Sequence, residues 1–190
     1  VMQGLFYDML EANPVIAAVK DMEGLGQCCQ TEEIRVVFIL FGDLCSIGAI
    51  VEQVKAADKV AMVHMDLVQG LSSKEIAVDF IKQYTKADGI ISTKPMMIKR
   101  AKELELYTVM RFFLLDSMAL ENLERQLGVL RPDVIEILPG VMPKIIRKIC
   151  GMVKVPVIAG GLITDKEDIM AVLSAGAMAV SSSNQGTWAM

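Results

Sequence analysis

Residues 155–182 read VPVIAGGLITDKEDIMAVLSAGAMAVSS and hold one complete strand–helix–strand unit. A short apolar run at Val155–Ala159 ends in two glycines, and residues 164–167 (TDKE) then have the spacing of a helix start, with a capping side chain followed by an acidic one. A second short run, Ala177–Ser182, follows the predicted helix. Strands as apolar as these are typical of a parallel sheet that is covered on both faces.

The same unit recurs along the chain. Short β-branched runs alternate with longer amphipathic segments, and Gly, Pro, Asp or Ser marks the junctions, which is the pattern of βα units. Eight such units can be counted. Besides the two strands above, the predicted strands are Val15–Val19, Val36–Phe41, Val60–Met65, Gly89–Ser92, Tyr107–Phe112 and Val134–Leu138.

Several of the intervening segments carry helix signals. One helix is predicted to begin at Ser46 and to end near Ala57. Another is predicted to begin at residues 72–75 (SSKE), where a Ser provides the cap and a Glu follows three residues on. Leucines spaced with the helical period predict a core-facing helix over Met118–Leu130.

The repeated units predict the fold class. No linker, charge block or low-complexity tract divides the chain, so residues 1–190 are predicted to form a single α/β domain, a compact (β/α)8 TIM-barrel-like fold. At about 24 residues per unit the barrel would be short against the typical length of about 250 residues, so its helices and loops must be short. An open doubly wound sheet is the alternative, but it requires two of the eight strands to be wrong.

Composition excludes several classes of protein. With 53% hydrophobic and 22% charged residues and a mean hydropathy of +0.45, the chain is not disordered. Its apolar stretches, such as Val36–Phe41, are far shorter than the roughly 18 residues that span a bilayer, and no charged-then-apolar signal opens the sequence. We therefore expect no membrane association and a cytoplasmic location. The four cysteines include no CxxC pair and are expected to be reduced thiols in the core.

The distribution of basic residues matters more than the net charge. A net charge of −4 and a pI near 5.1 argue against binding of nucleic acid through the overall field. Two stretches, 94–102 and 144–154, are nevertheless locally basic, and the second lies in a segment, 137–164, without any acidic residue. A solvated helix surface is the alternative explanation. The candidate RNA contacts are Lys99, Arg100, Lys144, Arg147 and Lys148.

Polar residues gather at the predicted mouth of the barrel, where the carboxyl ends of the strands meet and barrels carry their function. His64 and Asp66 are two residues apart and so share a strand face that points into the mouth. Buried charges are costly unless they are paired or used, and mutual neutralisation in a polar core layer is the alternative to ligand binding. The candidate ligand contacts are Lys20, Asp43, His64, Asp66, Ser92, Arg111 and Glu136.

Two kinds of chemistry are weaker possibilities at this mouth. His64 is the sole histidine, so a hydrogen bond to a ligand is favoured over catalysis, which needs a partner at defined spacing. Asp43, Asp66 and Glu136 have the oxygen ligands that Mg²⁺ prefers, but scattered carboxylates are a weak signal. We expect no bound metal and no resident cofactor.

The loops after the last two strands favour phosphate binding. Gly160 and Gly161 leave backbone N–H groups free to face a ligand, although a double glycine can also be only a tight corner. Ser182 and Ser183 lead into a short last helix whose N-terminus can receive an anion. Barrels commonly bind phosphate at this position, so these four residues are the predicted phosphate site.

The chain resembles the glycerol uptake operon antiterminator regulatory proteins (GlpP-type) over essentially its whole length. Ordered, widely spread motifs carry the resemblance and make it more specific than any single one would. They are residues 13–20 (NPVIAAVK), 40–44 (LFGDL), 64–67 (HMDL), 70–71 (GL), 87–93 (ADGIIST), 111–117 (RFFLLDS), 136–140 (EILPG), 158–163 (IAGGLI) and 181–184 (SSSN).

The resemblance implies a (β/α)8 barrel that responds to glycerol 3-phosphate, binds the leader messenger RNA of glycerol-utilisation genes and prevents premature termination of transcription. It implies a regulator instead of an enzyme, with an oligomer possible. The glycine pair and serine run match the family's phosphate site, and the mouth charges match its other polar positions. The alternative is a barrel enzyme acting on a small phosphorylated metabolite, with His64, Asp66 or Glu136 as acid or base.

Overall fold

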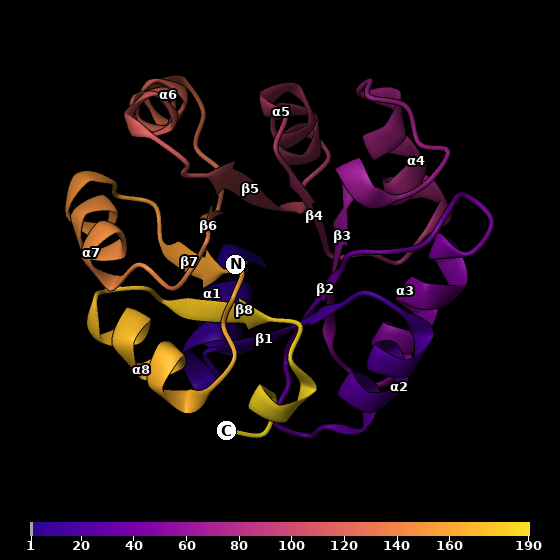
Figure 1. Cartoon of the computed structure of the whole chain (residues 1–190). Coiled ribbons are helices and arrows are strands. Elements are labelled where there is room, and N and C mark those ends of the chain that lie inside the picture. The colour runs from indigo at the N-terminus through magenta and orange to yellow at the C-terminus, as the bar shows by residue number, and fades with distance from the viewer. Residues whose placement is uncertain (1) are drawn as a thin grey trace.

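The computed structural model describes residues 2–190 and confirms the predicted (β/α)8 barrel (Figure 1). All eight strands are parallel, each pairs with the next along the chain, and the last pairs with the first to close the barrel. The strands are β1 (Val15–Val19), β2 (Val36–Ile39), β3 (Val60–His64), β4 (Gly89–Ser92), β5 (Tyr107–Phe113), β6 (Val134–Leu138), β7 (Val157–Gly160) and β8 (Ala179–Ser182).

Seven helices surround the barrel, and one lies at its end. None of the helices within residues 2–190 is long and apolar enough to cross a membrane. The helices are α1 (Met2–Ala12), α2 (Met22–Gln30), α3 (Ile47–Ala56), α4 (Ile76–Tyr84), α5 (Pro95–Glu103), α6 (Ser117–Val129), α7 (Pro143–Met152) and α8 (Lys166–Ser174), with 3-10 turns η1 (Met65–Leu67) and η2 (Gln185–Thr187).

Some predicted strand ends need correction. β3 stops at His64 instead of Met65 because the chain turns there into η1. β7 begins at Val157, after Pro156, which has no N–H to donate to a ladder. β8 begins at Ala179, because Gly176, with φ +113°, still turns the chain before it. β2 ends at Ile39, two residues earlier than predicted.

Two predicted helix caps were wrong in detail. The serine cap at residues 72–75 does not form: α4 begins after Glu75 without a side-chain cap, and Ser72 Oγ instead accepts from Lys74 N. At α8 the capping side chain is Asp165, whose carboxylate accepts from Asp168 N at 2.9 Å. Both differences arise because Ser and Asp compete to bond nearby backbone, and the local turn decides which of them caps the helix.

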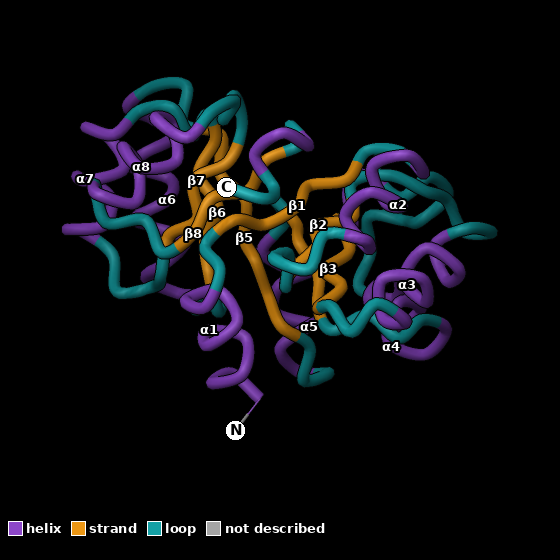
Figure 2. The backbone as a smooth tube through the Cα atoms, turned by 90° about the horizontal axis from the view of Figure 1, so that it is seen from below, coloured by secondary structure: helices purple, strands orange, loops and turns teal. Residues whose placement is uncertain are grey.

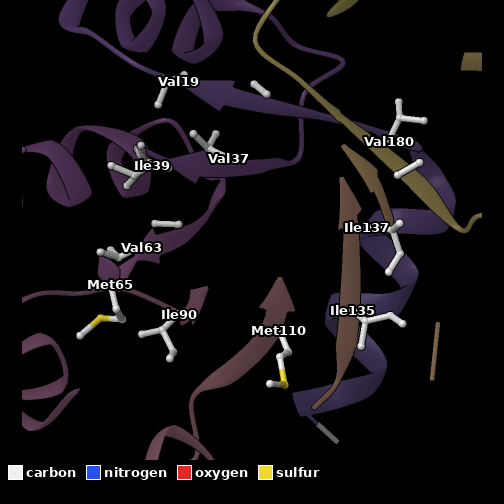
Figure 3. Close-up of a cluster of buried hydrophobic side chains, with 14 of the residues drawn as sticks. Val19, Val37, Ile39, Val63, Met65, Ile90, Met110, Ile135, Ile137 and Val180 are labelled. Atoms are coloured by element: carbon white, nitrogen blue, oxygen red, sulfur yellow. The ribbon is translucent and has the colours of Figure 1, made fainter. Parts of the chain in front are cut away.

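A large apolar layer lies between the strands and the outer helices. Its strand side chains alternate with those that face the barrel interior, so each strand is buried on both faces. Ten of these side chains are labelled in Figure 3, around the barrel. They are Val19, Val37, Ile39, Val63, Met65, Ile90, Met110, Ile135, Ile137 and Val180.

An additional helix that was not predicted from the sequence, α1, closes the amino-terminal end of the barrel. Figure 2 shows this helix beyond one end of the strands. Phe6 and Leu10, one helical turn apart, are fully buried against the apolar interior layer, and the Phe6 ring stacks on Tyr107 with ring centroids 4.7 Å apart. Tyr7 Oη donates to the Asp133 carbonyl at 2.8 Å. The helix therefore serves as a plug for one end of the barrel.

The four cysteines differ in burial, although all were predicted to lie in the core. All four cysteines are free, and Cys28 is fully buried, but Cys45 is exposed, so its expected place in the core was wrong. Cys45 lies in the β2–α3 loop, where its backbone N–H bonds Asp43. Burial, followed by the neighbouring Cys29, raises the pKa of the Cys28 thiol to about 12, so it stays protonated and unreactive near neutral pH.

Two leucine-to-alanine substitutions in the plug helix should differ sharply in their effect on the free energy of unfolding. Leu10→Ala should lower the free energy of unfolding by about 2–5 kcal/mol, because it opens a cavity under the barrel floor. Leu5→Ala in the same helix should cost less than about 0.5 kcal/mol, because Leu5 is 54% exposed. Urea unfolding monitored by circular dichroism measures both, and equal losses would contradict the plug.

Candidate functional site

A polar layer sits directly above the apolar interior of the barrel. Along five strands the interior-facing positions change from apolar to polar two residues further on, for example from Val109 to Arg111 and from Val134 to Glu136. Strand alternation therefore turns these polar side chains into the mouth. They are Lys20, His64, Arg111, Glu136 and Ser181.

A buried ion pair occupies the centre of this layer. Arg111 Nε donates to Glu136 Oε2 at 2.8 Å, and the two residues are register partners on β5 and β6. The Glu136 side chain is completely buried, and its second oxygen accepts from Ser181 Oγ. Both carboxylate oxygens are thus satisfied within the protein. The terminal nitrogens of Arg111, Nη1 and Nη2, have no hydrogen-bond acceptor within residues 2–190.

A small cavity of about 120 Å³ opens over this ion pair. Typical pockets for drug-sized ligands have about 300–1,000 Å³, so this one suits a smaller molecule. Lys20 is exposed at its edge, and no acidic side chain among residues 2–190 forms an ion pair with it. The cavity is lined by Ala18, Lys20, Leu40, Arg111, Glu136, Leu138, Gly161, Leu162, Ile163 and Ser181 to Ser183.

Gly160 and Gly161 are each required to be glycine, for two different structural reasons. A Cβ on Gly160 would overlap Glu136 Oε1 and Ser181 Oγ, so only glycine leaves room for that hydrogen bond. Gly161 has φ +83° and Leu162 has φ +62°, two left-handed residues in succession. Such a turn lies at the wall of the mouth cavity, where both residues are part of its lining. The N–H groups of Gly161 and Leu162 bond no acceptor within residues 2–190.

Ser182 and Ser183 have different structural roles. Ser182 Oγ donates to the Ile163 carbonyl at 3.1 Å and accepts from Thr187 Oγ1 at 2.9 Å, so its hydroxyl joins the last two loops. Ser183 is exposed and lines the cavity. The predicted last helix is only the three-residue turn η2, and Asn184 already caps it by accepting from Gly186 N. Its N-terminus is therefore not an anion site, which corrects that part of the prediction.

His64 is buried without a partner. Its side chain is 2% exposed, and neither ring nitrogen has a hydrogen-bond partner within the described chain. Burial, followed by the positive charge of Arg111, lowers the pKa of the imidazole to about 4, so it is neutral at pH 7. Buried polar groups are normally satisfied, so the unpartnered ring is a candidate for contact with a ligand, but His64 lies beneath the mouth cavity's lining and is not part of its wall.

Asp66 ties two loops together. Burial opposes its ionisation, but bonds from Thr93 and then Ser92 outweigh burial and hold the pKa of this carboxyl below its ordinary value. Thr93 donates from both its N–H and its Oγ1, and Ser92 Oγ donates at 2.9 Å. Asp66 and Ser92 therefore form one network that connects η1 with the β4–α5 loop, beside the cavity instead of on its wall.

Asp43 lies away from the cavity. It holds the β2–α3 turn, where its carboxylate accepts from the backbone N–H of Cys45 and Ser46 at 2.9 and 2.8 Å. Within residues 2–190, no three side chains of the His, Cys, Asp and Glu types come close enough to hold a metal ion. Asp43, Asp66 and Glu136 thus do not form the Mg²⁺ site considered from the sequence.

The basic side chains proposed for RNA contact differ in availability. Lys99, Lys144, Arg147 and Lys148 are exposed. Arg100 is engaged: it donates from Nε and Nη2 to Asp79, and from Nη1 to Glu103. The basic stretch on α5 is therefore partly neutralised.

Sequence reasoning missed two contributors to the site. Ser181 was noted as part of a serine run, but strand alternation alone was enough to turn it inward beside Glu136. The left-handed conformation of Leu162 had no signal, since a leucine gives no reason to expect positive φ.

Comparisons with known proteins agree with this architecture. Residues 15–188 match the family model described as glycerol-3-phosphate responsive antiterminator. The chain is 42% identical over 182 residues to YgcP of Escherichia coli K12, covering 96% of this chain and 95% of that protein.

Two crystal structures are similar along nearly the full length. A glycerol uptake operon antiterminator regulatory protein from Listeria monocytogenes superposes with a TM-score of 0.88 at 32% identity, covering 92% of this chain and 94% of the other. A glycerol uptake operon antiterminator-related protein from Thermotoga maritima gives a TM-score of 0.83 at 37% identity, covering 94% and 99%.

The low pKa of His64, the sole histidine, predicts how the stability of the protein depends on pH. Its pKa in the folded state lies near 4, below the ordinary 6.5, so the unfolded chain binds a proton first as pH falls. Stability should therefore drop between about pH 6.5 and 4, by about 3 kcal/mol at most. NMR of the single imidazole measures the pKa directly, and a midpoint between 6 and 7 would contradict the buried environment.

The packing around Glu136 predicts the effect of one added methyl group. Gly160→Ala should lower the free energy of unfolding by about 1–3 kcal/mol, because its Cβ displaces the Glu136–Ser181 contact. Gly128→Ala is the matched control: it has open space around the new Cβ and should stabilise α6 by up to about 1 kcal/mol. Opposite signs in urea unfolding are expected, and two equal effects would show that Gly160 is not constrained.

Proposed function

The chain belongs to the glycerol-3-phosphate responsive antiterminator family, and on that premise we propose that it is a glycerol 3-phosphate sensor that acts on RNA. When loaded with glycerol 3-phosphate, it binds the leader messenger RNA of glycerol uptake and utilisation genes and prevents premature termination of transcription. Since that RNA is made in the cytoplasm, the regulator acts there.

The converging cations and N–H groups at the mouth carry the proposal. Arg111, Lys20, Gly161 and Leu162 border one cavity of about 120 Å³, and the N–H groups of the last two bond no acceptor within residues 2–190. Glu136 is already neutralised by Arg111 and Ser181, so the cavity keeps a net positive character. Fixed N–H donors and cations are what a phosphate group requires. Gly160, Ser182 and Ser183 complete this phosphate site through backbone shape and loop attachment.

The glycerol end of the ligand needs partners for two hydroxyls. His64 offers a neutral ring with both nitrogens unpartnered, and it lies close enough to Arg111 for that charge to lower the pKa of the imidazole. Glu136 lines the cavity and Asp66 lies near enough to His64 to act on its pKa, so both carboxylates would reach a glycerol hydroxyl as further acceptors, beside the bonds that they already accept from Arg111, Ser181, Ser92 and Thr93. Asp43 and Ser92 act through the loops that they hold, by keeping the mouth in shape.

The enzyme alternative has less support. A histidine base is normally oriented by a third group, yet neither nitrogen of His64 is bonded to Asp66 or Glu136. We therefore propose that the site binds its ligand without converting it. Phosphorus NMR of glycerol 3-phosphate incubated with the protein should show no change, and a new resonance would favour an enzyme.

The RNA response follows from differential affinity. A ligand changes RNA binding only if it prefers one of two conformations, and the βα loops around the cavity are the segments that it touches. Exposed basic residues on α7 and the exposed Lys99 of α5 provide surfaces for phosphates of the RNA.

Ligand binding should depend on Lys20. Lys20→Gln should weaken glycerol 3-phosphate by about 10- to 100-fold, because a charge-assisted contact of about 1.5–3 kcal/mol is lost. Lys74→Gln, an exposed lysine elsewhere, should leave the affinity unchanged. Isothermal titration calorimetry measures both, with glycerol as a ligand that lacks the phosphate. Equal affinity for glycerol and glycerol 3-phosphate would contradict a phosphate site.

The regulatory response is testable with a leader transcript. Gel-shift affinity for the leader of a glycerol uptake operon should increase at saturating glycerol 3-phosphate and decrease steeply with salt. Replacing Gly161 with Val should abolish the ligand effect before it abolishes basal RNA binding, because positive φ and the nearby Leu138 leave no place for a branched side chain. An affinity that does not respond to the ligand would refute the sensor.

A further inference from the structure

A cavity of about 640 Å³, larger than that at the mouth, opens at the opposite end of the barrel. It lies between the last turns of α6 and α7 and reaches Tyr7 of the plug helix. Leu127, Met152 and Val153 give it an apolar lining. We call this cavity the basal groove.

Three cations border the basal groove. They are Lys102, Arg131 and Lys154, all exposed, and none of them forms an ion pair within residues 2–190. Of the two acids in the lining, Asp133 is buried and accepts from Thr108 N at 2.8 Å, so its charge is directed into the protein, and only Glu124 is exposed against the three cations. Positive charge therefore dominates the rim.

The positive surface continues along α7. Lys144, Lys148 and Met152 are spaced four residues apart and so form one line on the helix, with Arg147 beside it. These basic side chains are exposed and have no ion-pair partner in the described chain. Since residues 137–164 contain no acid, nothing on α7 interrupts the line before it reaches the basal groove at Met152.

We propose that the basal groove and the exposed face of α7 form one binding surface for single-stranded RNA. The inference rests on the proposed function and adds the position and the kind of RNA. An apolar floor with cations at its rim accepts unstacked bases below and phosphates above, which is how single strands are held. A duplex keeps its bases stacked inside and cannot place them in the groove. Tyr7 contributes an aromatic ring to the same lining.

The α7 helix also connects this surface with the mouth. Leu138, at the end of β6, lines the mouth cavity, and the helix that follows this strand ends at Met152 in the basal groove. A ligand that shifts the β6–α7 loop therefore acts directly on an element of the RNA surface.

The test removes three cations at a time. The variant Arg131→Gln, Lys148→Gln, Lys154→Gln is compared with Arg35→Gln, Lys74→Gln, Lys82→Gln, which loses the same charge from exposed positions away from the groove. Fluorescence anisotropy follows a labelled leader transcript at saturating glycerol 3-phosphate over a salt series. The groove variant should lose about tenfold or more in affinity, and its salt slope should fall by about 2. The control should match the wild type.

A second pair of variants guards against misfolding. Gly151 in α7 and Gly26 in α2 both have open space where a Cβ would be added. Gly151→Glu should weaken RNA binding, Gly26→Glu should not, and both should bind glycerol 3-phosphate as the wild type does. Groove variants that bind RNA as tightly as their controls would overturn the surface while leaving the sensor intact.

Measurements on the wild type distinguish a failure of the proposed function from a failure of the proposed RNA surface. If it binds no leader transcript with or without the ligand, the proposed function fails and this surface fails with it. Polyuridylate should displace the transcript, whereas the double-stranded polyadenylate–polyuridylate complex should not. Equal competition by the duplex would overturn the single-strand specificity, and competition only by an acidic polypeptide would indicate a protein partner instead.

Discussion

The buried pair of Arg111 and Glu136 is the interaction on which the mouth depends. A carboxylate without solvent exposure is tolerated only if its oxygens are bonded, and here Arg111 and Ser181 take one each. Gly160 is required because any side chain there would displace these contacts. The pair, with Gly160 on β7 and Ser181 on β8, therefore joins four neighbouring strands at the mouth.

The pair of Arg111 and Glu136 also sets the charge of the mouth cavity. Because Glu136 is already neutralised, the remaining donors of Arg111 and the ammonium of Lys20 make the small cavity attractive to an anion. The same positive charge beside His64 adds to burial in keeping the pKa of that ring low, which leaves it neutral as a hydrogen-bond partner. Charge pairing in one layer of the barrel thus determines both the charge of the mouth cavity and the protonation state of His64.

The sequence predicted the barrel and its eight strands because periodic apolar runs identify strands that are buried on both faces. It also placed Arg111 and Glu136 at the mouth, but not as partners, since the pairing depends on the register of β5 against β6. The plug helix α1 was missed, because Phe6 and Leu10 reveal their role only once the barrel floor is present. The basal groove depends likewise on how α6 and α7 end in space.

The barrel has a small cavity bordered by Lys20 and Arg111 at its mouth and a basic surface that begins on α7. If glycerol 3-phosphate at the mouth and RNA on α7 are coupled as proposed, the coupling must be reciprocal. The most direct measurement is the affinity for glycerol 3-phosphate with and without saturating leader RNA. We expect RNA to tighten ligand binding by the same factor by which the ligand tightens RNA binding. An unchanged ligand affinity would contradict it.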